Sequence, residues 1–221
     1  MKVAQIWRYP IKSMSGEQVN HARIGSLGIE GDRIVHVKDV RGHIITARTH
    51  HRLLGHRATL NASGEPLVDG VLWNDPTVRE ELANIVGLGV RLVRDESTKR
   101  FDVLPLLVAT DGAIAAFGYD GRRLRPNLVI GGVEGLSERG WPGQCLRIGD
   151  VIIGIQDLRG RCIMTTFDPD SLKQDRQVLM DIARKFGGTL ALNCYVIRGG
   201  EIRGGDSVEL LPKDECETIC A

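Results

Sequence analysis

The stretch GDVIIGIQDL, residues 149–158, places a Gly-Asp turn signal directly before a run of aliphatic residues. Such a run after a turn is typical of a buried strand. Similar runs recur along the chain and predict strands over residues 3–7, 18–24, 34–38, 43–46, 127–130, 190–197 and 207–211. Many short strands with few helices predict a mainly β fold, a barrel with peripheral helices rather than a doubly wound sheet.

Three helices are expected among these strands. Asp75 is suited to cap a helix with Pro76 at its first position, and Gly87 ends the apolar periodicity that follows. A second helix is predicted to begin near Ser171, because apolar residues recur at spacings of three and four before Gly187. A shorter helix is expected over residues 111–117.

Composition and charge restrict the class of protein. The chain has 221 residues, 42% hydrophobic and 26% charged, the balance of a soluble globular protein. Its formal net charge of +1 argues against a dedicated nucleic-acid binder, which would carry a strong basic excess. No apolar run reaches the roughly 20 residues that span a bilayer, and residues 1–9 lack a signal-peptide core. These features predict a cytoplasmic protein without a membrane segment.

The cysteine content points the same way. Five cysteines are an odd number, and only Cys216 and Cys220 lie close together. In a reducing compartment such cysteines are expected to be buried hydrophobes, metal ligands or catalytic thiols rather than disulfides. The Cys216–Cys220 pair lacks the second ligand pair of a structural zinc site.

Cations occur in small groups next to predicted strands. Lys12 and Ser13 end the first strand, and Arg33 closes a glycine-containing turn. Arg122, Arg123 and Arg125 precede a buried strand. The Lys12–Ser13 pair and the three arginines each suit a phosphate anion, whereas Arg33 by itself is also consistent with an exposed charged turn. The alternatives are solvated charges at strand ends and in loops and, for the arginines before the buried strand, a nucleic-acid contact, which the low net charge disfavours.

The segment RGRCIMTTFDPD, residues 159–170, contains the cysteine that lies beside an arginine, Cys162. A neighbouring guanidinium favours the thiolate form of a cysteine. A thiolate is the ligand that soft or redox-active metals prefer. The alternative interpretation is a buried, inert cysteine.

In this order, these groups resemble the MOSC family, named after the C-terminal domain of molybdenum cofactor sulfurases. YPIKS (9–13), GDR (31–33) and TAR (46–48) are similar to its N-terminal β-barrel module. RPNLVI (125–130), RC (161–162) and GDSV (205–208) are similar to the MOSC domain itself. The resemblance implies a MOSC-type β-barrel fold. Its expected divisions are an N-terminal module over 1–60, a helical connecting segment over 61–100, a MOSC domain over 101–213 and a tail over 214–221.

The resemblance also implies a molybdenum cofactor, in which one molybdenum is bound by molybdopterin. Cys162 matches the metal's protein ligand and is the expected catalytic residue. The residues that match cofactor-binding positions or adjoin the metal ligand are Lys12, Ser13, Arg33, Thr110, Arg125, Asn127 and Arg161.

The branch most similar in its motifs is that of the amidoxime-reducing components and their bacterial counterparts. It implies an oxidoreductase that reduces small N-hydroxylated or N-oxygenated compounds. The chain has neither a ferredoxin-like cysteine spacing nor a dinucleotide fingerprint. Electrons are therefore expected from a separate flavin, iron–sulfur or haem protein. Two alternatives stay open: a carrier of the intact cofactor, and a sulfur-transfer protein with a persulfide on Cys162.

Overall fold

A computed structural model describes residues 1–220 and has an eight-stranded sheet as its largest element. In sheet order its strands are β16 (Glu209–Leu211), β12 (Cys145–Ile148), β13 (Val151–Gly160), β14 (Thr189–Arg198), β10 (Leu106–Thr110), β11 (Leu128–Gly131), β1 (Lys2–Arg8) and β2 (Glu17–Val19). Neighbouring strands are antiparallel, except for the parallel pair β10 and β11. The prediction of a mainly β fold is confirmed.

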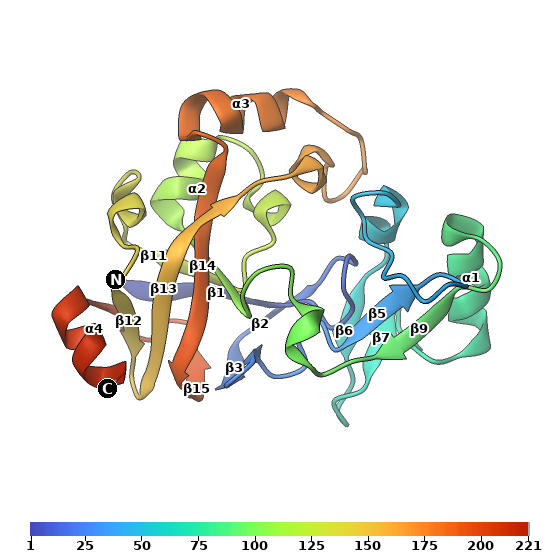
Figure 1. The fold of residues 1–221 in the computed structure, drawn as a ribbon, viewed down its shortest axis with the longest axis horizontal. Helices are drawn as coiled ribbons and strands as arrows, with labels where there is room; N and C mark the ends of the chain where they lie inside the picture. The colour runs from blue at the N-terminus through green and yellow to red at the C-terminus, as the bar shows by residue number, and fades with distance from the viewer. Residues whose placement is uncertain (221) are drawn as a thin grey trace.

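A second sheet of three strands packs against the large one. It consists of β15 (Gly200–Arg203), β3 (His21–Gly25) and β4 (Gly28–Ile29). The two sheets share one apolar core, to which β13 contributes Ile153 and Ile155 and β14 contributes Leu192. Because β13 is long, it leads from this core to the loop that carries the candidate site (Figure 1).

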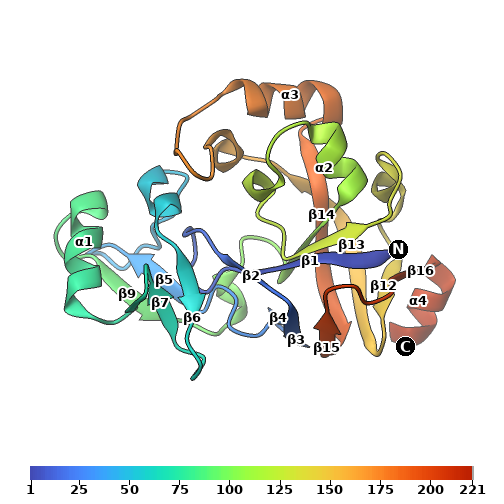
Figure 2. The ribbon, with the colours of Figure 1, turned by 180° about the vertical axis from the view of Figure 1, so that it is seen from behind.

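A smaller lobe lies at the end of the molecule opposite the C-terminal helix α4 (Lys213–Cys220), as both views show (Figures 1 and 2). Its strands are β5 (Val35–Lys38), β6 (Ala58–Leu60), β7 (Pro66–Val68), β8 (Val71–Leu72) and β9 (Arg91–Arg94). They enclose a separate core with the helices η1 (His51–Gly55) and α1 (Pro76–Val86). Residues 61–100, expected as a helical connection, therefore contribute three strands to this lobe as well as α1.

The helices follow the predicted patterns in part. Asp75 caps α1 by accepting a hydrogen bond from Thr77 N at 2.8 Å. The predicted helix over 111–117 is present as α2 (Asp111–Phe117). The helix expected from Ser171 is α3 (Gln177–Phe186), and it begins later because Ser171 N donates to Asp168 Oδ1 in a tight turn. None of the helices within residues 1–220 is long and apolar enough to cross a membrane.

Four short 3-10 helices complete the described chain: η2 (Thr98–Arg100), η3 (Gly121–Leu124), η4 (Ser137–Gly140) and η5 (Ile163–Thr166). The strand predicted over 43–46 is absent, since only Ile44 forms a bridge there, to Lys38. The strand predicted over 18–24 is divided at Asn20 into β2 and β3.

The expectation of reduced cysteines is wrong at one pair. Cys145 on β12 and Cys216 on α4 form a disulfide within a small apolar cluster. The pairing depends on α4 folding back onto β12, which the sequence spacing of 71 residues does not reveal. The side chain of Cys220 lies outside the described part of the structure. Cys162 and Cys194 are free thiols.

Candidate functional site

A cavity of about 110 Å³ lies beside Cys162, where residues of the smaller lobe meet the end of β13. We call it the Cys162 cavity. Its wall brings together most of the predicted site residues from distant parts of the sequence: Lys12, Ser13, Arg33, Arg125, Arg161 and Cys162. The segments 46–48 and 159–165 complete much of the wall.

The wall of the Cys162 cavity carries a large excess of positive charge. It contains one carboxylate, that of Asp102, and seven cationic side chains. The cations are Lys12, Arg33, Arg48, Arg123, Arg125, Arg159 and Arg161. Closely spaced like charges repel one another, so this arrangement favours a multiply charged anion in the cavity.

Asp102 binds three of these cations. It accepts hydrogen bonds from Lys12 Nζ at 2.7 Å and from Arg48 Nη2 at 2.8 Å, and Arg159 Nη2 lies 3.8 Å away. Burial opposes ionisation, but the hydrogen bond from Lys12 and the cationic neighbours outweigh it and lower the pKa of Asp102. Sequence reasoning missed Asp102, because residue 102 belongs to no recognisable motif and its partners come from other segments. Arg159 lies in the quoted segment 159–170, but its place on the cavity wall was not predicted.

Lys12 is held with most of its side chain buried. Its Nζ donates to Arg100 O at 2.9 Å as well as to Asp102. An ammonium group has three N–H donors, so one remains for a ligand in the cavity. Burial lowers the pKa of Lys12, while the hydrogen bond to Asp102 opposes that shift.

Arg125 has no carboxylate partner among residues 1–220. Its guanidinium lies 4.3 Å from the ring centroid of Tyr9, and the guanidinium of Arg33 lies 5.2 Å from the same ring. Burial lowers the pKa of Arg125 to about 10, so the group is still charged at neutral pH. Burial also raises the pKa of Tyr9 to about 12, which keeps the phenol neutral between the two cations. Arg125 therefore has its hydrogen-bond donors available to an anion.

A buried network fixes the positions of Arg33 and Tyr9. Asp32 is fully buried, accepts a hydrogen bond from Tyr9 N at 2.7 Å and forms an ion pair with Arg33. Arg33 Nη1 also donates to Asn127 Oδ1 at 3.3 Å, and Tyr9 OH donates to Pro126 O at 3.1 Å. These contacts connect the GDR motif to the RPN motif across the two lobes.

Three of the predicted residues, Ser13, Arg33 and Arg125, have positive φ angles of 72°, 54° and 55°. This left-handed conformation costs on the order of 1–2 kcal/mol for a residue with a Cβ atom. Only six non-glycine residues within the described range adopt it. Its concentration on this wall is typical of functional sites, where surrounding structure maintains a strained backbone.

The Cys162 thiol is half-buried at the start of η5. Burial by itself would lower the pKa of Arg48. The negative charge of Asp102 and a hydrogen bond with Cys162 outweigh this effect, so the pKa of Arg48 is raised. Burial lowers the pKa of Arg161 to about 10. Arg161 Nη2 donates to Leu124 O at 2.7 Å, whereas its buried Nε atom has no hydrogen-bond partner among the described residues. Arg48 was part of a quoted motif, but its position beside the thiol was not predicted.

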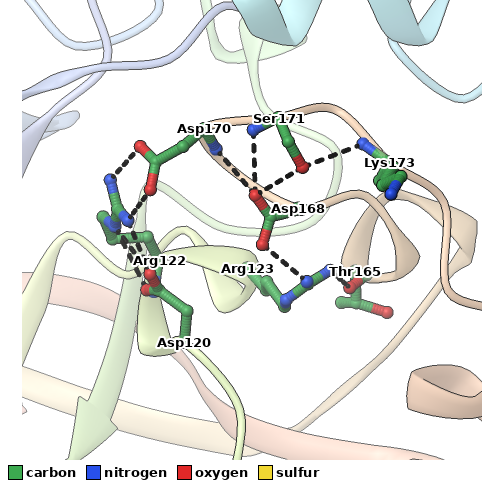
Figure 3. A network of polar contacts seen from close by, with 8 residues as sticks. All are labelled: Asp120, Arg122, Arg123, Thr165, Asp168, Asp170, Ser171 and Lys173. Atoms are coloured by element: carbon green, nitrogen blue, oxygen red, sulfur yellow. Dashed lines mark hydrogen bonds and ion pairs between the residues drawn. The ribbon is translucent and has the colours of Figure 1, made fainter.

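Arg122 and Arg123, the other two arginines considered as phosphate ligands, form ion pairs with carboxylates (Figure 3). Arg122 forms ion pairs with Asp120 and Asp170, each at 2.6 Å. Arg123 binds Asp168 Oδ2 at 3.0 Å and Thr165 O at 3.3 Å. This paired network fastens the loop after η5 to η3, and so holds the segment that carries Cys162.

Thr110 and Asn127 do not line the Cys162 cavity. Thr110 is fully buried, and its hydroxyl caps α2 by accepting a hydrogen bond from Ala113 N at 3.0 Å. The Asn127 side chain is also buried. Its Oδ1 accepts hydrogen bonds from Arg33 and Leu107 N, and its Nδ2 donates to Trp7 O. Asn127 thus lies one contact behind the cavity wall, and Thr110 belongs to the framework of α2.

A larger hollow of about 340 Å³ adjoins the Cys162 cavity and shares Arg123, Arg125 and Met164 with it. Its wall includes the aromatic side chains of Trp7, Tyr9 and Phe167. Small-molecule sites usually measure about 300–1,000 Å³. The two spaces together reach that range, whereas the Cys162 cavity alone does not.

Comparison with protein families identifies two domains. Residues 1–85 match the MOSC N-terminal beta barrel domain, and residues 112–209 match the MOSC domain. The matched regions carry the two sets of motifs that meet at the Cys162 cavity.

Curated proteins with similar sequences include two amidoxime-reducing components. The human mitochondrial amidoxime-reducing component 1 is 25% identical over 95% of this chain and 82% of its own length. The mitochondrial amidoxime reducing component 2 of Macaca fascicularis is 26% identical over 83% of this chain and 72% of its own. Among solved structures, the YUAD protein from Bacillus subtilis has a TM-score of 0.53, with 13% identity and coverage of 95% of this chain and 94% of that one. At that identity the likeness concerns the fold alone.

Proposed function

Since the chain belongs to the MOSC-domain family, we propose that its Cys162 cavity binds a molybdenum cofactor and that the protein reduces N-oxygenated compounds. The observation that carries the proposal is one free thiol on a wall with seven cations, of which Arg125 and Arg161 form no ion pair among residues 1–220. A cofactor of this kind presents a phosphate and a metal that accepts thiolate, and both needs are met within the same cavity.

The donor set fits the two ends of such a cofactor. Arg125 and Arg161 have guanidinium N–H groups without hydrogen-bond partners among residues 1–220, which suits a phosphate. Cys162 is a free, half-buried thiol on the same wall, beside Arg48, and sulfur is a ligand that suits a soft metal. The adjoining aromatic hollow offers room for the organic ring system or for a substrate beside it.

When bound, this cofactor supplies two-electron chemistry at molybdenum, which suits the reductive cleavage of an N–O bond. The overall reaction consumes two electrons and two protons and yields the N–H product and water. We assign the chain's own residues to binding and orientation. Lys12, Arg33 and Arg125 neutralise the phosphate, and Asp102 aligns Lys12 and Arg48 at the wall. Electrons are assigned to a separate donor protein.

The experiment begins with molybdenum and pterin content per chain in freshly purified protein. Loaded parent protein is then assayed with a chemical reductant and an amidoxime or hydroxylamine, alongside Cys162→Ala. Cys194→Ala is the matched control, because Cys194 is free but fully buried and lies outside the cavity. We expect Cys162→Ala to lose the protein-derived sulfur neighbour in molybdenum X-ray absorption and to lose turnover, and Cys194→Ala to keep both.

Two outcomes would contradict parts of this proposal. An unchanged number of Mo–S neighbours in Cys162→Ala would exclude Cys162 as the ligand. Fully loaded parent protein that turns over no amidoxime, hydroxylamine or N-oxide would favour a cofactor carrier instead. Sulfane sulfur on Cys162 in metal-free protein would favour a sulfur-transfer role.

A further inference from the structure

Three side chains with metal-ligand chemistry converge in the smaller lobe. His56 follows η1, Asp69 lies in the turn between β7 and β8, and Glu81 belongs to α1. Their ligand atoms all lie within 4.8 Å of one another. None of the three lines the Cys162 cavity or the adjoining hollow, so the proposed reductase function makes no use of them.

The distances suit a tetrahedral ion. His56 Nδ1 lies 2.7 Å from Asp69 Oδ2 and 4.0 Å from Glu81 Oε1. Around an ion with metal–ligand distances of about 2.0–2.1 Å, tetrahedral ligand atoms are about 3.3 Å apart. The two observed separations lie on either side of this value. An ion bound to Nδ1 in place of its proton therefore needs Asp69 to retreat from His56 and Glu81 to approach it, each by less than 1 Å, with the two carboxylate ligand atoms starting within 4.8 Å of each other.

The fold positions two ligands firmly and leaves the third adjustable. The His56 side chain is 10% exposed. Asp69 is held by Arg57, whose backbone N–H donates to Oδ1 at 2.8 Å and whose carbonyl accepts from Asp69 N at 2.9 Å. This leaves Oδ2 for an ion. The Glu81 side chain is 59% exposed on α1 and is free to close over the ion.

Charge and space also favour a cation. The carboxylates of Asp69 and Glu81 face the imidazole of His56. Arg52 lines the neighbouring cavity, but it forms no ion pair with either carboxylate within residues 1–220. That cavity, of about 360 Å³, also borders His56 and Glu81 and offers room for water as a fourth ligand. If His56 and Asp69 formed only a structural hydrogen bond, the third ligand atom, that of Glu81, would not be needed within 4.8 Å of them.

We propose that His56 Nδ1, Asp69 Oδ2 and Glu81 Oε1 bind one divalent transition ion of the Zn²⁺ type. One nitrogen and two oxygens, without sulfur, suit Zn²⁺ better than Mg²⁺, which prefers an all-oxygen octahedral shell. The ion ties α1 to the β7–β8 turn and to the end of η1. It is a second metal site, independent of the Cys162 cavity.

The test is a Zn²⁺ titration of the metal-stripped full chain against a chromophoric chelator. We expect one Zn²⁺ per chain in the parent and an affinity at least tenfold lower in Glu81→Gln and Asp69→Asn. Glu80→Gln is the matched control, since Glu80 is exposed on the same helix and is not part of the cluster. Cys162→Ala controls for zinc bound by the free thiol.

Two further readouts separate the site from simple misfolding. Zn²⁺ should raise the Tm of the parent and of Glu80→Gln by several degrees, and should raise that of Glu81→Gln clearly less at the same Zn²⁺ concentration. Zinc X-ray absorption should show only nitrogen and oxygen neighbours. Absence of stoichiometric binding in the parent, equal affinity in Glu81→Gln, or sulfur neighbours that disappear in Cys162→Ala would each overturn the proposal.

Discussion

Arginines only a few residues apart have opposite environments in this molecule. Arg122 and Arg123 are neutralised by Asp120, Asp168 and Asp170 in the paired network (Figure 3). Arg125, on the same segment, faces the Cys162 cavity with the ring of Tyr9 against its guanidinium and no carboxylate partner in the described part of the chain. The same residue type therefore performs two tasks, of which one fastens a loop and the other is available to bind an anion.

The difference shows that partners, and not the number of arginines, decide where an anion binds. Each guanidinium in the paired network already has a carboxylate, so a phosphate there would have to displace it. In the Cys162 cavity a single carboxylate, Asp102, serves three cations. Anion affinity should therefore respond strongly to substitution of Arg125 or Arg161 in the cavity and weakly to substitution of Arg122 in the paired network.

The largest effect is expected for Arg125→Ala. Each charge-assisted hydrogen bond to a phosphate contributes roughly 1.5–3 kcal/mol, so retention of the cofactor should fall about ten- to a hundredfold. Arg161→Ala should behave similarly, because its guanidinium also forms no ion pair with a carboxylate among residues 1–220. Molybdenum and pterin content after extensive dialysis measures the loss. If both variants kept the molybdenum and pterin content of the parent, the cavity could not be the phosphate site.

A smaller effect of opposite sign is expected for Asp102→Asn. The carboxylate competes with an anion for Lys12, Arg48 and Arg159. Two unit charges about 4 Å apart interact by about 1 kcal/mol in water, so removing the carboxylate charge from the cavity wall should raise the anion affinity about fivefold. Binding of inorganic phosphate to the cofactor-free chain, measured by calorimetry, tests the sign. Weaker phosphate binding by the variant would mean that Asp102 aligns the cations without competing for them.

The pH dependence of stability should report the same carboxylate. Its cationic neighbours lower the pKa of Asp102 in the folded chain, against the opposing effect of burial. A lowered folded pKa stabilises the fold above the unfolded value of about 3.9 and loses that contribution as the pH falls through the folded value. Denaturant unfolding should therefore show the parent more stable than Asp102→Asn at pH 7, with the gap closing below about pH 4. A gap that widens on acidification would contradict this assignment.

The smallest effect is expected for Arg122→Ala in the paired network. The Arg122 side chain is 41% exposed, and exposed ion pairs contribute about 0–1 kcal/mol. Tm should fall slightly, and the cofactor content should equal that of the parent. A loss as large as that of Arg125→Ala would erase the distinction between the two regions.

The sequence by itself determined several strands of the large sheet, three of the α-helices and the motifs of the site, but not β10, β12 or the 3-10 helices. Apolar runs predicted β1, β5, β11, β13 and β14, and the Asp75, Pro76 and Gly87 signals located α1 within a residue. These features depend on local periodicity and on capping, which a single segment records. The order of the cationic and cysteine motifs predicted the MOSC family, and the domain matches confirm it.

Only the tertiary structure decided which charges are paired. Asp102, Asp168 and Asp170 neutralise particular cations because η2, η5 and the loop after it approach them from other parts of the chain. The turn at Asp168 also delayed the start of α3, and the return of α4 joined Cys216 to Cys145. Coulomb and hydrogen-bond energies depend on distances of a few ångströms, and residue spacing along the chain does not determine such distances between remote segments.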